Sequence, residues 1–392
     1  MSDSLVILSA MRTPIGAMQG IFNTVTAPQL GGAAIAAALK ASGLSGADIE
    51  EVVMGCVLLA GQGQAPARQA ALAGGLSVAT PATTVNKMCG SGMKAVMTAA
   101  DQIRLGDVRF SVAGGMESMT SAPYLLPKAR GGYRMGHGQL LDHMFYDGLQ
   151  SPWDGQLMGC FADVTAKHYQ VGRDEQDAYT AESVKRALHA CESGAFNAEV
   201  TPVTYMSRNG EVTVDKDETP YTCDVARISR LKPSFSKDGT VTAASSSSIS
   251  DGASALVLGS AEAAHARGLR PLARIVDYAS FAQEPERFTT APIGAIKRLM
   301  KRTGWKTADV DLFEINEAFA IVAMVAQRDL GIDPARINVN GGACALGHPI
   351  GATGARITTT LLHALIKRGL KRGIASLCIG GGEATAIAVE CL

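Results

Sequence analysis

Residues 83–95 read Thr-Thr-Val-Asn-Lys-Met-Cys-Gly-Ser-Gly-Met-Lys-Ala, a run that predicts a strand, a tight turn and a helix in succession. The β-branched residues 83–85 indicate a short buried strand, and the apolar spacing over residues 93–104 indicates a helix. Cys89 lies in the glycine-rich turn between them, where the unpaired N–H groups at the start of the helix favour a thiolate. A reactive cysteine and a buried structural cysteine both fit this turn, so the rest of the chain must decide between them.

The alternation of strand and helix continues around this unit. Strand-like runs at 6–10, 52–58 and 110–113 alternate with alanine-rich helical runs at 29–42 and 65–76. This order predicts an α/β fold with mainly parallel sheets covered by helices.

The composition changes between residues 120 and 248. Glycine, methionine and aromatic residues fill the segment 124–153, and an amphipathic helix is predicted over 173–193. Because this stretch is long and carries a helix and aromatic anchors of its own, we interpret it as an inserted lobe. His137 and His143 have no partner at metal-ligand spacing, so they are expected to be ordinary solvated histidines.

Short matches recur in the same order in the first and last thirds of the chain. Val85-Asn86 matches Val339-Asn340, and Gly114-Gly115-Met116-Glu117 matches Gly381-Gly382-Glu383. The shared order suggests two duplicated α/β halves. The predicted division is an N-terminal half (1–119 and 249–268), an inserted lobe (120–248) and a C-terminal half (269–392).

Charge and cysteine usage exclude several classes of protein. The 392 residues carry 36 Lys and Arg against 36 Asp and Glu, so no net field attracts nucleic acid or an anionic membrane. The eight cysteines are scattered without a Cys-x-x-Cys pair, which is typical of free thiols in a reducing compartment. No run approaches the roughly 18 apolar residues of a membrane span, and the first residues do not read as a signal peptide. We therefore expect a soluble, cytoplasmic protein with no nucleic-acid or membrane partner.

A histidine in the second half has the chemistry that a reactive cysteine needs. His348 lies in a glycine-rich loop before a predicted helix, and Pro349 holds its backbone extended. An imidazole at this point can accept the proton of Cys89. Cys344 lies four residues earlier, but two ligands without a second pair do not make a metal site.

Two further segments carry groups that suit acyl chemistry. Cys378 precedes the run Gly380-Gly381-Gly382, whose backbone N–H groups can form an oxyanion hole. Asn316 can hold a water molecule or a carbonyl oxygen, although a structural asparagine in a turn fits that position equally well.

Four blocks, taken in chain order, resemble the signature blocks of the thiolases. They read Val-Asn-Lys-Met-Cys-Gly-Ser-Gly (85–92), Asn-Glu-Ala-Phe-Ala (316–320), Gly-His-Pro-Ile-Gly-Ala-Thr-Gly (347–354) and Cys-Ile-Gly-Gly-Gly (378–382). Within that family they are most similar to the acetyl-CoA acetyltransferases. The resemblance implies duplicated five-layer α/β/α/β/α halves with an inserted loop lobe over the active site, usually in a homotetramer. It also implies acetyl-CoA, acetoacetyl-CoA and CoA as substrates and products, and no metal or redox cofactor.

The resemblance assigns a role to each reactive group. Cys89 becomes the acylated nucleophile of a reversible Claisen condensation of two acetyl-CoA molecules to acetoacetyl-CoA and CoA. His348 activates it and, with a water held by Asn316, stabilises the enolate oxygen. Cys378 moves protons to and from the α-carbon or the leaving thiol, and the N–H groups of Cys89 and Gly380 form a second oxyanion hole.

The resemblance also implies positions that contact the substrate, and the chain departs from the family at some of its coenzyme A positions. The residues 242–248 read Thr-Ala-Ala-Ser-Ser-Ser-Ser where Thr-Ala-Gly-Asn-Ala-Ser-Gly is usual, and Leu157 and Pro220 replace a common histidine and arginine. Phe288 stands where methionine is common, and we expect its ring to cap the acyl pocket and favour acetyl groups. The expected substrate-binding residues are Met158, Arg227, Ala243, Ser247, Phe288, Ala318 and Phe319.

Three alternatives remain beside this interpretation. A degradative 3-ketoacyl-CoA thiolase of broader chain length shares the same blocks. A non-catalytic thiolase-like subunit is disfavoured by the joint presence of Cys89, His348, Cys378 and Asn316. In a ketoacyl-carrier-protein synthase we expect histidine or asparagine at the position of Cys378.

Overall fold

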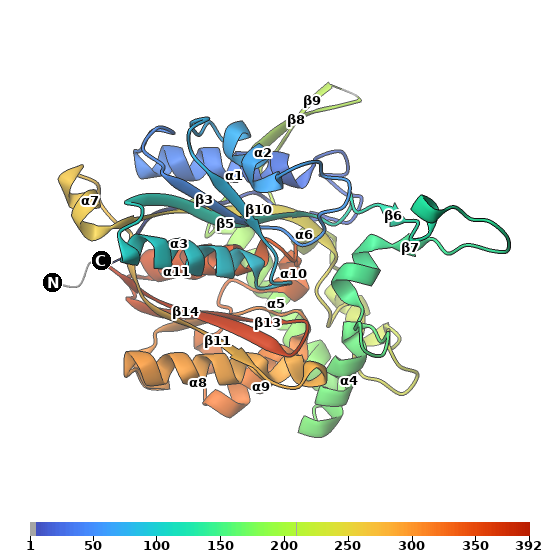
Figure 1. The fold of residues 1–392 in the computed structure, drawn as a ribbon. Coiled ribbons are helices and arrows are strands. Elements are labelled where there is room, and N and C mark those ends of the chain that lie inside the picture. Colours follow the sequence, from blue (N-terminus) through green and yellow to red (C-terminus); the bar gives the residue numbers. More distant parts are fainter. Residues whose placement is uncertain (1–4, 209) are drawn as a thin grey trace.

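Five layers of helices and sheets make up the body of the chain, whose computed structural model describes residues 5–208 and 210–392. Figure 1 shows two outer helical layers, two sheets and a central helical layer between the sheets, which confirms the predicted layer order. The longer helices are α1 (Ala27–Ser42), α2 (Pro66–Ala73), α3 (Ser91–Leu105), α4 (Met158–Tyr169), α5 (Arg173–Glu192), α8 (Ala291–Thr303), α9 (Ala320–Leu330) and α11 (Thr353–Arg368). Helices α6 (Thr219–Thr222), α7 (Ala261–Ala266) and α10 (Ala343–Leu346) are short.

The two sheets join edge to edge. Their strands are β1 (Leu5–Arg12), β3 (Glu51–Gly55), β4 (Ala82–Val85), β5 (Phe110–Ser118), β10 (Ser250–Ser260), β11 (Ala273–Ala282), β12 (Leu312–Ile315), β13 (Arg372–Ile379) and β14 (Glu383–Cys391), and β2 (Gly16–Ala17) pairs with β10. The strand order is β12-β13-β14-β11-β1-β10-β5-β3-β4, with β1 and β11 pairing at Val6–Arg274 and Ile7–Ala273. Outward from this pair, the order β1-β10-β5-β3 matches β11-β14-β13-β12: each half places its first strand beside its last and the earlier strands beyond, as expected of a duplication.

The expectation of mainly parallel sheets is wrong. Among the described strands of the large sheets, β3 pairs in parallel with β4 and β5, and β12 with β13, whereas the other neighbouring strands pair antiparallel. The chain returns antiparallel from β5 to β10 after the inserted segment, and from β13 to β14 through the short turn at residues 380–382. The connections between sequential parallel neighbours run through helices, from β3 to β4 through α2 and from β12 to β13 through α9 and α11.

The strand before Cys89 lies at an edge, so the expectation of a buried strand is also wrong. Residues 82–85 form β4, which pairs only with β3 among the described strands and leaves Thr83 exposed. By contrast, every residue of β5 is buried because helices cover both faces of the sheet there.

The segment between β5 and β10 contains the small hairpins β6 (Tyr124–Leu125) with β7 (Leu141–Asp142), and β8 (Val203–Ser207) with β9 (Gly210–Val214). The β6–β7 hairpin projects from the body in Figure 1. We propose that this inserted lobe extends from residue 120 to residue 248. No helix in the described part of the chain is long and apolar enough to cross a membrane.

His143, which belongs to this segment, is not the solvated histidine that the sequence predicts. Its side chain is buried, its Nδ1 lies 2.6 Å from Oδ2 of Asp147, and the backbone N–H of Ala60 donates to its Nε2 at 3.3 Å. The partner is Asp147, which lies four residues after His143 and pairs with its ring. His137 is exposed, as expected.

Two glycines allow the central helices α3 and α11 to begin in direct contact. A Cβ added to Gly92 would lie 2.8 Å from the backbone nitrogen of Ala355, and one added to Gly354 would lie 2.3 Å from that of Met93. Only glycine permits this approach. The contact brings the loop before α3, which carries Cys89, next to the loop before α11, which carries His348.

Candidate active site

The turn that presents Cys89 is built from local hydrogen bonds and one unusual backbone angle. Met88 has φ of 48°, the left-handed region that few side chains adopt, so the chain reverses sharply just before Cys89. The side chain of Asn86 accepts from the N–H of Met88 at 2.9 Å. The hydroxyl of Ser91 accepts from the N–H of Lys87 at 2.8 Å and donates to the carbonyl of Met88 at 2.6 Å. The sequence therefore fixes the cysteine at the entrance to α3.

The Cys89 turn borders a cavity of about 340 Å³. Cys89, His348 and Gly380 line it together, although they lie on three separate segments of the chain. Its other walls are largely apolar. Five of the expected substrate-binding residues also line it: Met158, Ser247, Phe288, Ala318 and Phe319.

The remaining predicted residues lie elsewhere. Cys378, near the end of β13, and Asn316, just after β12, are fully buried and do not line the cavity, but Asn316 contacts His348. Arg227, in the short helix η3 (Val225–Arg230), and Ala243 are exposed and do not line the cavity. The structure thus brings Cys89, His348 and Gly380 to one cavity and places these last two residues outside its lining.

Burial outweighs the backbone N–H groups that the sequence predicts to favour a Cys89 thiolate. Burial raises the pKa of Cys89 to about 11, and the N–H groups of Gly380 and of Cys89 itself only partly oppose this shift. Burial, and after it the nearby Cys89, raises the pKa of Cys378 well above its ordinary value. A base must therefore remove the proton from Cys89 before it can attack.

His348 has the protonation state of such a base. Burial, followed by the positive charge of Arg356, lowers the pKa of His348 to about 3, so its ring is neutral. The hydroxyl of Thr353 lies 2.7 Å from Nδ1 of His348 and 2.9 Å from the carbonyl oxygen of Pro349. Because the hydroxyl has one hydrogen and the carbonyl can only accept, Thr353 donates to Pro349 and accepts from Nδ1–H. The lone pair is then on Nε2, which has no hydrogen-bond partner within the described residues.

Glu117, which the sequence marks only by its repeat motif, holds the His348 loop. It lies in β5 and accepts hydrogen bonds from the N–H groups of Val57, Leu58 and Gly351 at 3.0, 3.1 and 2.8 Å. Burial raises its pKa to about 7. A glutamate inside an apolar strand needs partners, and this is the sequence signal that points to it. Thr353 has no such signal, because one polar residue at a helix start is ordinary.

The altered block at residues 242–248 still forms an ordered turn. The hydroxyl of Ser245 accepts from the N–H of Thr242 at 2.8 Å. The N–H and hydroxyl of Ser247 donate to the carbonyl oxygen of Ala318 at 3.0 and 3.1 Å. The serines therefore attach this block to the segment that carries Asn316. The cavity residues that the sequence analysis did not predict come mainly from this block and the inserted segment: Met119, Phe145, Gly148, Leu149, Leu157, Gly159, Phe235, Ser246, Ser248, Ile249 and Ile350.

Comparison with known proteins identifies the family. The model of the thiolase N-terminal domain matches residues 5–262, and that of the thiolase C-terminal domain matches residues 269–391. The chain belongs to the thiolase family, as its four sequence blocks predict.

Particular thiolases match nearly the full chain. The acetyl-CoA acetyltransferase of Pseudomonas aeruginosa is 48% identical over 387 residues, which cover 98% of each protein. Acetyl-CoA acetyltransferase 2 of Arabidopsis thaliana is 49% identical over 389 residues, covering 98% of this chain and 96% of that protein. The crystal structure of Acat5 thiolase from Ascaris suum in complex with coenzyme A has a TM-score of 0.94 and 42% identity, covering 99% of this chain and 100% of that one.

Proposed function

We propose that this chain is an acetyl-CoA C-acetyltransferase, which condenses two acetyl-CoA molecules reversibly to acetoacetyl-CoA and CoA. The observation that carries the proposal is the shared cavity of Cys89, the unpartnered Nε2 of His348 and the N–H of Gly380. The names of the relatives and the coenzyme A bound to the Ascaris suum thiolase support the substrate class.

In the first half of the reaction the enzyme is acetylated. Nε2 of His348 takes the proton of Cys89, and the resulting thiolate attacks the thioester carbonyl of acetyl-CoA. The N–H groups of Cys89 and Gly380 donate to the oxygen that becomes negative. The CoA thiolate leaves with the proton of Cys378, so the products are acetyl-Cys89, a protonated His348 and a Cys378 thiolate.

In the second half the carbon–carbon bond forms. The Cys378 thiolate takes a proton from the methyl group of a second acetyl-CoA, and the enolate oxygen is stabilised by Nε2–H of His348 and a water held by Asn316. The enolate carbon attacks the acetyl group and expels the Cys89 thiolate. That thiolate recovers its proton from His348, which returns all three side chains to their starting states.

The acyl end of the cavity supports acetyl specificity over the broader 3-ketoacyl alternative. Phe288 lines the cavity with its ring almost fully buried, so a longer acyl chain would have to displace it. Arg227 and Ala243 stay proposals for contacts with the distant part of coenzyme A, which extends beyond the acyl group.

The test is thiolysis of acetoacetyl-CoA and of longer 3-ketoacyl-CoA thioesters, followed by loss of the enolate absorbance. We expect kcat/KM to fall by at least about 10-fold on extension from four carbons to six, since misfit in an apolar pocket is worth roughly 1–3 kcal/mol. Equal rates would favour the broad 3-ketoacyl-CoA thiolase, and no thiolysis of either would contradict both.

We also infer a homotetramer in the cytoplasm. The projecting hairpin exposes several large apolar side chains, among them Tyr124, Leu126 and Leu140, and Met135 is 97% exposed. Exposed apolar patches of this kind mark protein contacts. Sedimentation velocity that gives a monomer would contradict the proposed tetramer.

The cytoplasmic location is inferred from the cysteines. All eight are free, which suits a reducing compartment.

A further inference from the structure

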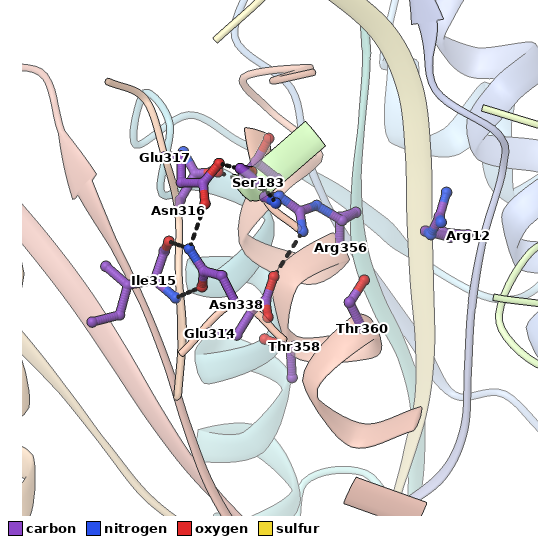
Figure 2. A network of polar contacts seen from close by, with 12 residues as sticks. Arg12, Ser183, Glu314, Ile315, Asn316, Glu317, Asn338, Arg356, Thr358 and Thr360 are labelled. Atoms are coloured by element: carbon purple, nitrogen blue, oxygen red, sulfur yellow. Dashed lines mark hydrogen bonds and ion pairs between the residues drawn. The ribbon is translucent and has the colours of Figure 1, made fainter. Parts of the chain in front are cut away.

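Arg356 is a buried guanidinium next to the candidate active site that does not line its cavity. It is in α11, three residues after Thr353, and its side chain is 2% exposed. Nη1 donates to Oε1 of Glu314 at 3.2 Å, and Nη2 donates to Oδ1 of Asn316 at 3.4 Å. Figure 2 shows Arg356 reaching from its helix toward the segment of residues 314–317. One guanidinium therefore contacts both a buried carboxylate and the amide that the proposed reaction uses.

The chemistry of arginine decides how the Asn316 amide is turned. A guanidinium has five N–H donors and no acceptor, so it can face only the oxygen end of an amide. The NH₂ end of Asn316 must then point away from Arg356. Nδ2 of Asn316 lies 3.5 Å from Nδ1 of His348, but Nδ1 carries the hydrogen that Thr353 accepts, so both atoms are donors and no hydrogen bond joins them. The hydrogens on Nδ2 thus stay available for the water molecule of the proposed reaction.

A single helix supports both active-site loops. Thr353 contacts Nδ1 of His348, and Arg356, nearly one turn later, contacts Asn316. The start of this helix is fixed by the close approach of Gly354 to α3. Both contacts therefore come from the first turn of one helix, and support from a regular element of this kind is what a preorganised site requires.

We propose that Arg356 is a positioning residue that fixes the Asn316 amide with its NH₂ group toward His348 and the reacting oxygen. The proposal rests on the proposed function, because it assigns Arg356 to the enolate step and not to the acetylation of Cys89. With the amide reversed, Oδ1 would accept a hydrogen of the water that Asn316 holds, and that hydrogen would no longer be available to the enolate oxygen.

The Arg356→Lys variant distinguishes positioning of the Asn316 amide from charge balance with Glu314. A lysine ammonium keeps the positive charge beside Glu314, but it is a single point donor and cannot serve two partners in the fixed geometry of a guanidinium. The Asn316 amide is then free to turn. Arg12→Lys is the matched control, because Arg12 is also fully buried and paired, with Glu199 and Asp217, and has no contact with Asn316. Figure 2 shows Arg12 apart from the Asn316 segment.

The experiment measures two partial reactions of each variant, both per acetylatable Cys89 so that unfolded protein does not count. One is the rate of Cys89 acetylation by acetyl-CoA, and the other is exchange of the acetyl-CoA methyl protons with D₂O. For Arg356→Lys we expect acetylation within about 3-fold of wild type and exchange lowered by at least about 10-fold, below the 10²–10³ of a fully lost oxyanion donor. For Arg12→Lys both rates should change by the same factor. Equal losses in the two reactions of Arg356→Lys would overturn the proposal.

A double-mutant cycle gives the second test. If Arg356 acts through Asn316, adding Arg356→Lys to Asn316→Ala should lower exchange by less than about 3-fold further, whereas independent effects would multiply. Multiplied losses would overturn the proposal.

The Asn316→Asp variant is a check that leaves Arg356 intact. It keeps an oxygen for Arg356 but offers no donor, so exchange should fall at least as far as in Asn316→Ala. Retained exchange in Asn316→Asp would also overturn it. A wild-type enzyme that forms no acetyl-Cys89 would instead contradict the proposed function itself.

Discussion

Phe288 is the side chain through which the structure most directly predicts substrate choice. It lies in the short helix η4 (Pro285–Thr290) and lines the cavity that contains Cys89. Its ring packs edge-to-face against Phe161 and Phe319, with ring centroids 6.4 Å apart in both pairs. Replacing Phe288 by alanine removes a rigid wall of the cavity without touching the reactive groups.

The substitution should change both the unfolding free energy and the substrate selectivity. Loss of a buried phenyl ring costs about 3–5 kcal/mol of unfolding free energy, which thermal or urea unfolding measures. The space released accepts a longer acyl chain, and each accommodated methylene is worth roughly 1–3 kcal/mol. The ratio of kcat/KM for 3-ketohexanoyl-CoA to that for acetoacetyl-CoA should therefore rise by at least about 10-fold, measured by thiolysis.

Phe161→Ala is the matched control for this change. Phe161 is buried against Phe288 but does not line the cavity, so its loss destabilises the same cluster without opening the acyl site. An unchanged ratio in Phe288→Ala, with normal acetylation of Cys89, would refute the reasoning. The same rise in Phe161→Ala would refute it as well, because selectivity would then follow loosened packing and not the cavity wall.

Three further predictions follow from the protonation states and contacts of the site. Cys378→Ala should still form acetyl-Cys89 but lose methyl-proton exchange by at least the ~10²-fold typical of a missing general base, as measured by NMR in D₂O. Thr353→Val should slow acetylation of Cys89 by about 10- to 100-fold, because the ring of His348 loses its 2.7 Å partner and its fixed tautomer. Since burial lowers the pKa of His348 from 6.5 to about 3, the unfolded chain binds a proton that the folded chain does not between those values. The unfolding free energy should thus decrease as the pH falls through this window, and less steeply in His348→Asn.

Each of these predictions has an outcome that contradicts it. Normal proton exchange in Cys378→Ala would remove that residue from the enolate step. Undiminished acetylation in Thr353→Val would mean that the loop alone orients the imidazole. Parallel pH curves for wild type and His348→Asn would mean that His348 is not neutral in the folded protein.

The sequence was sufficient for the parts of the fold that depend on local pattern. The glycine turn and the apolar spacing after Cys89 predicted α3, and the extended residue before Pro349 predicted the loop that presents His348. Matching motifs in the two halves indicated a duplication, and the resemblance to the thiolases implied the five layers. The turn, the helix and the loop rest on neighbouring residues, whose preferences can be read directly.

Features that depend on distant neighbours were not accessible in this way. The edge position of β4 and the antiparallel return of β10 are set by tertiary pairing, to which periodicity is blind. The raised pKa of Cys89 comes from burial, which no local motif reports. An arginine in a predicted helix usually indicates a solvent-exposed face. Arg356 is instead a buried donor, because α11 packs between the two sheets.

Cys89 carries the acyl group in the proposed reaction, and this role can be measured by brief incubation with acetyl-CoA, rapid acid quenching and peptide mass spectrometry. We expect one acetyl group per chain on the peptide that contains Cys89, and none in Cys89→Ala. Acetyl label on Cys378 or Cys344, or label that persists in Cys89→Ala, would show that another residue is the nucleophile.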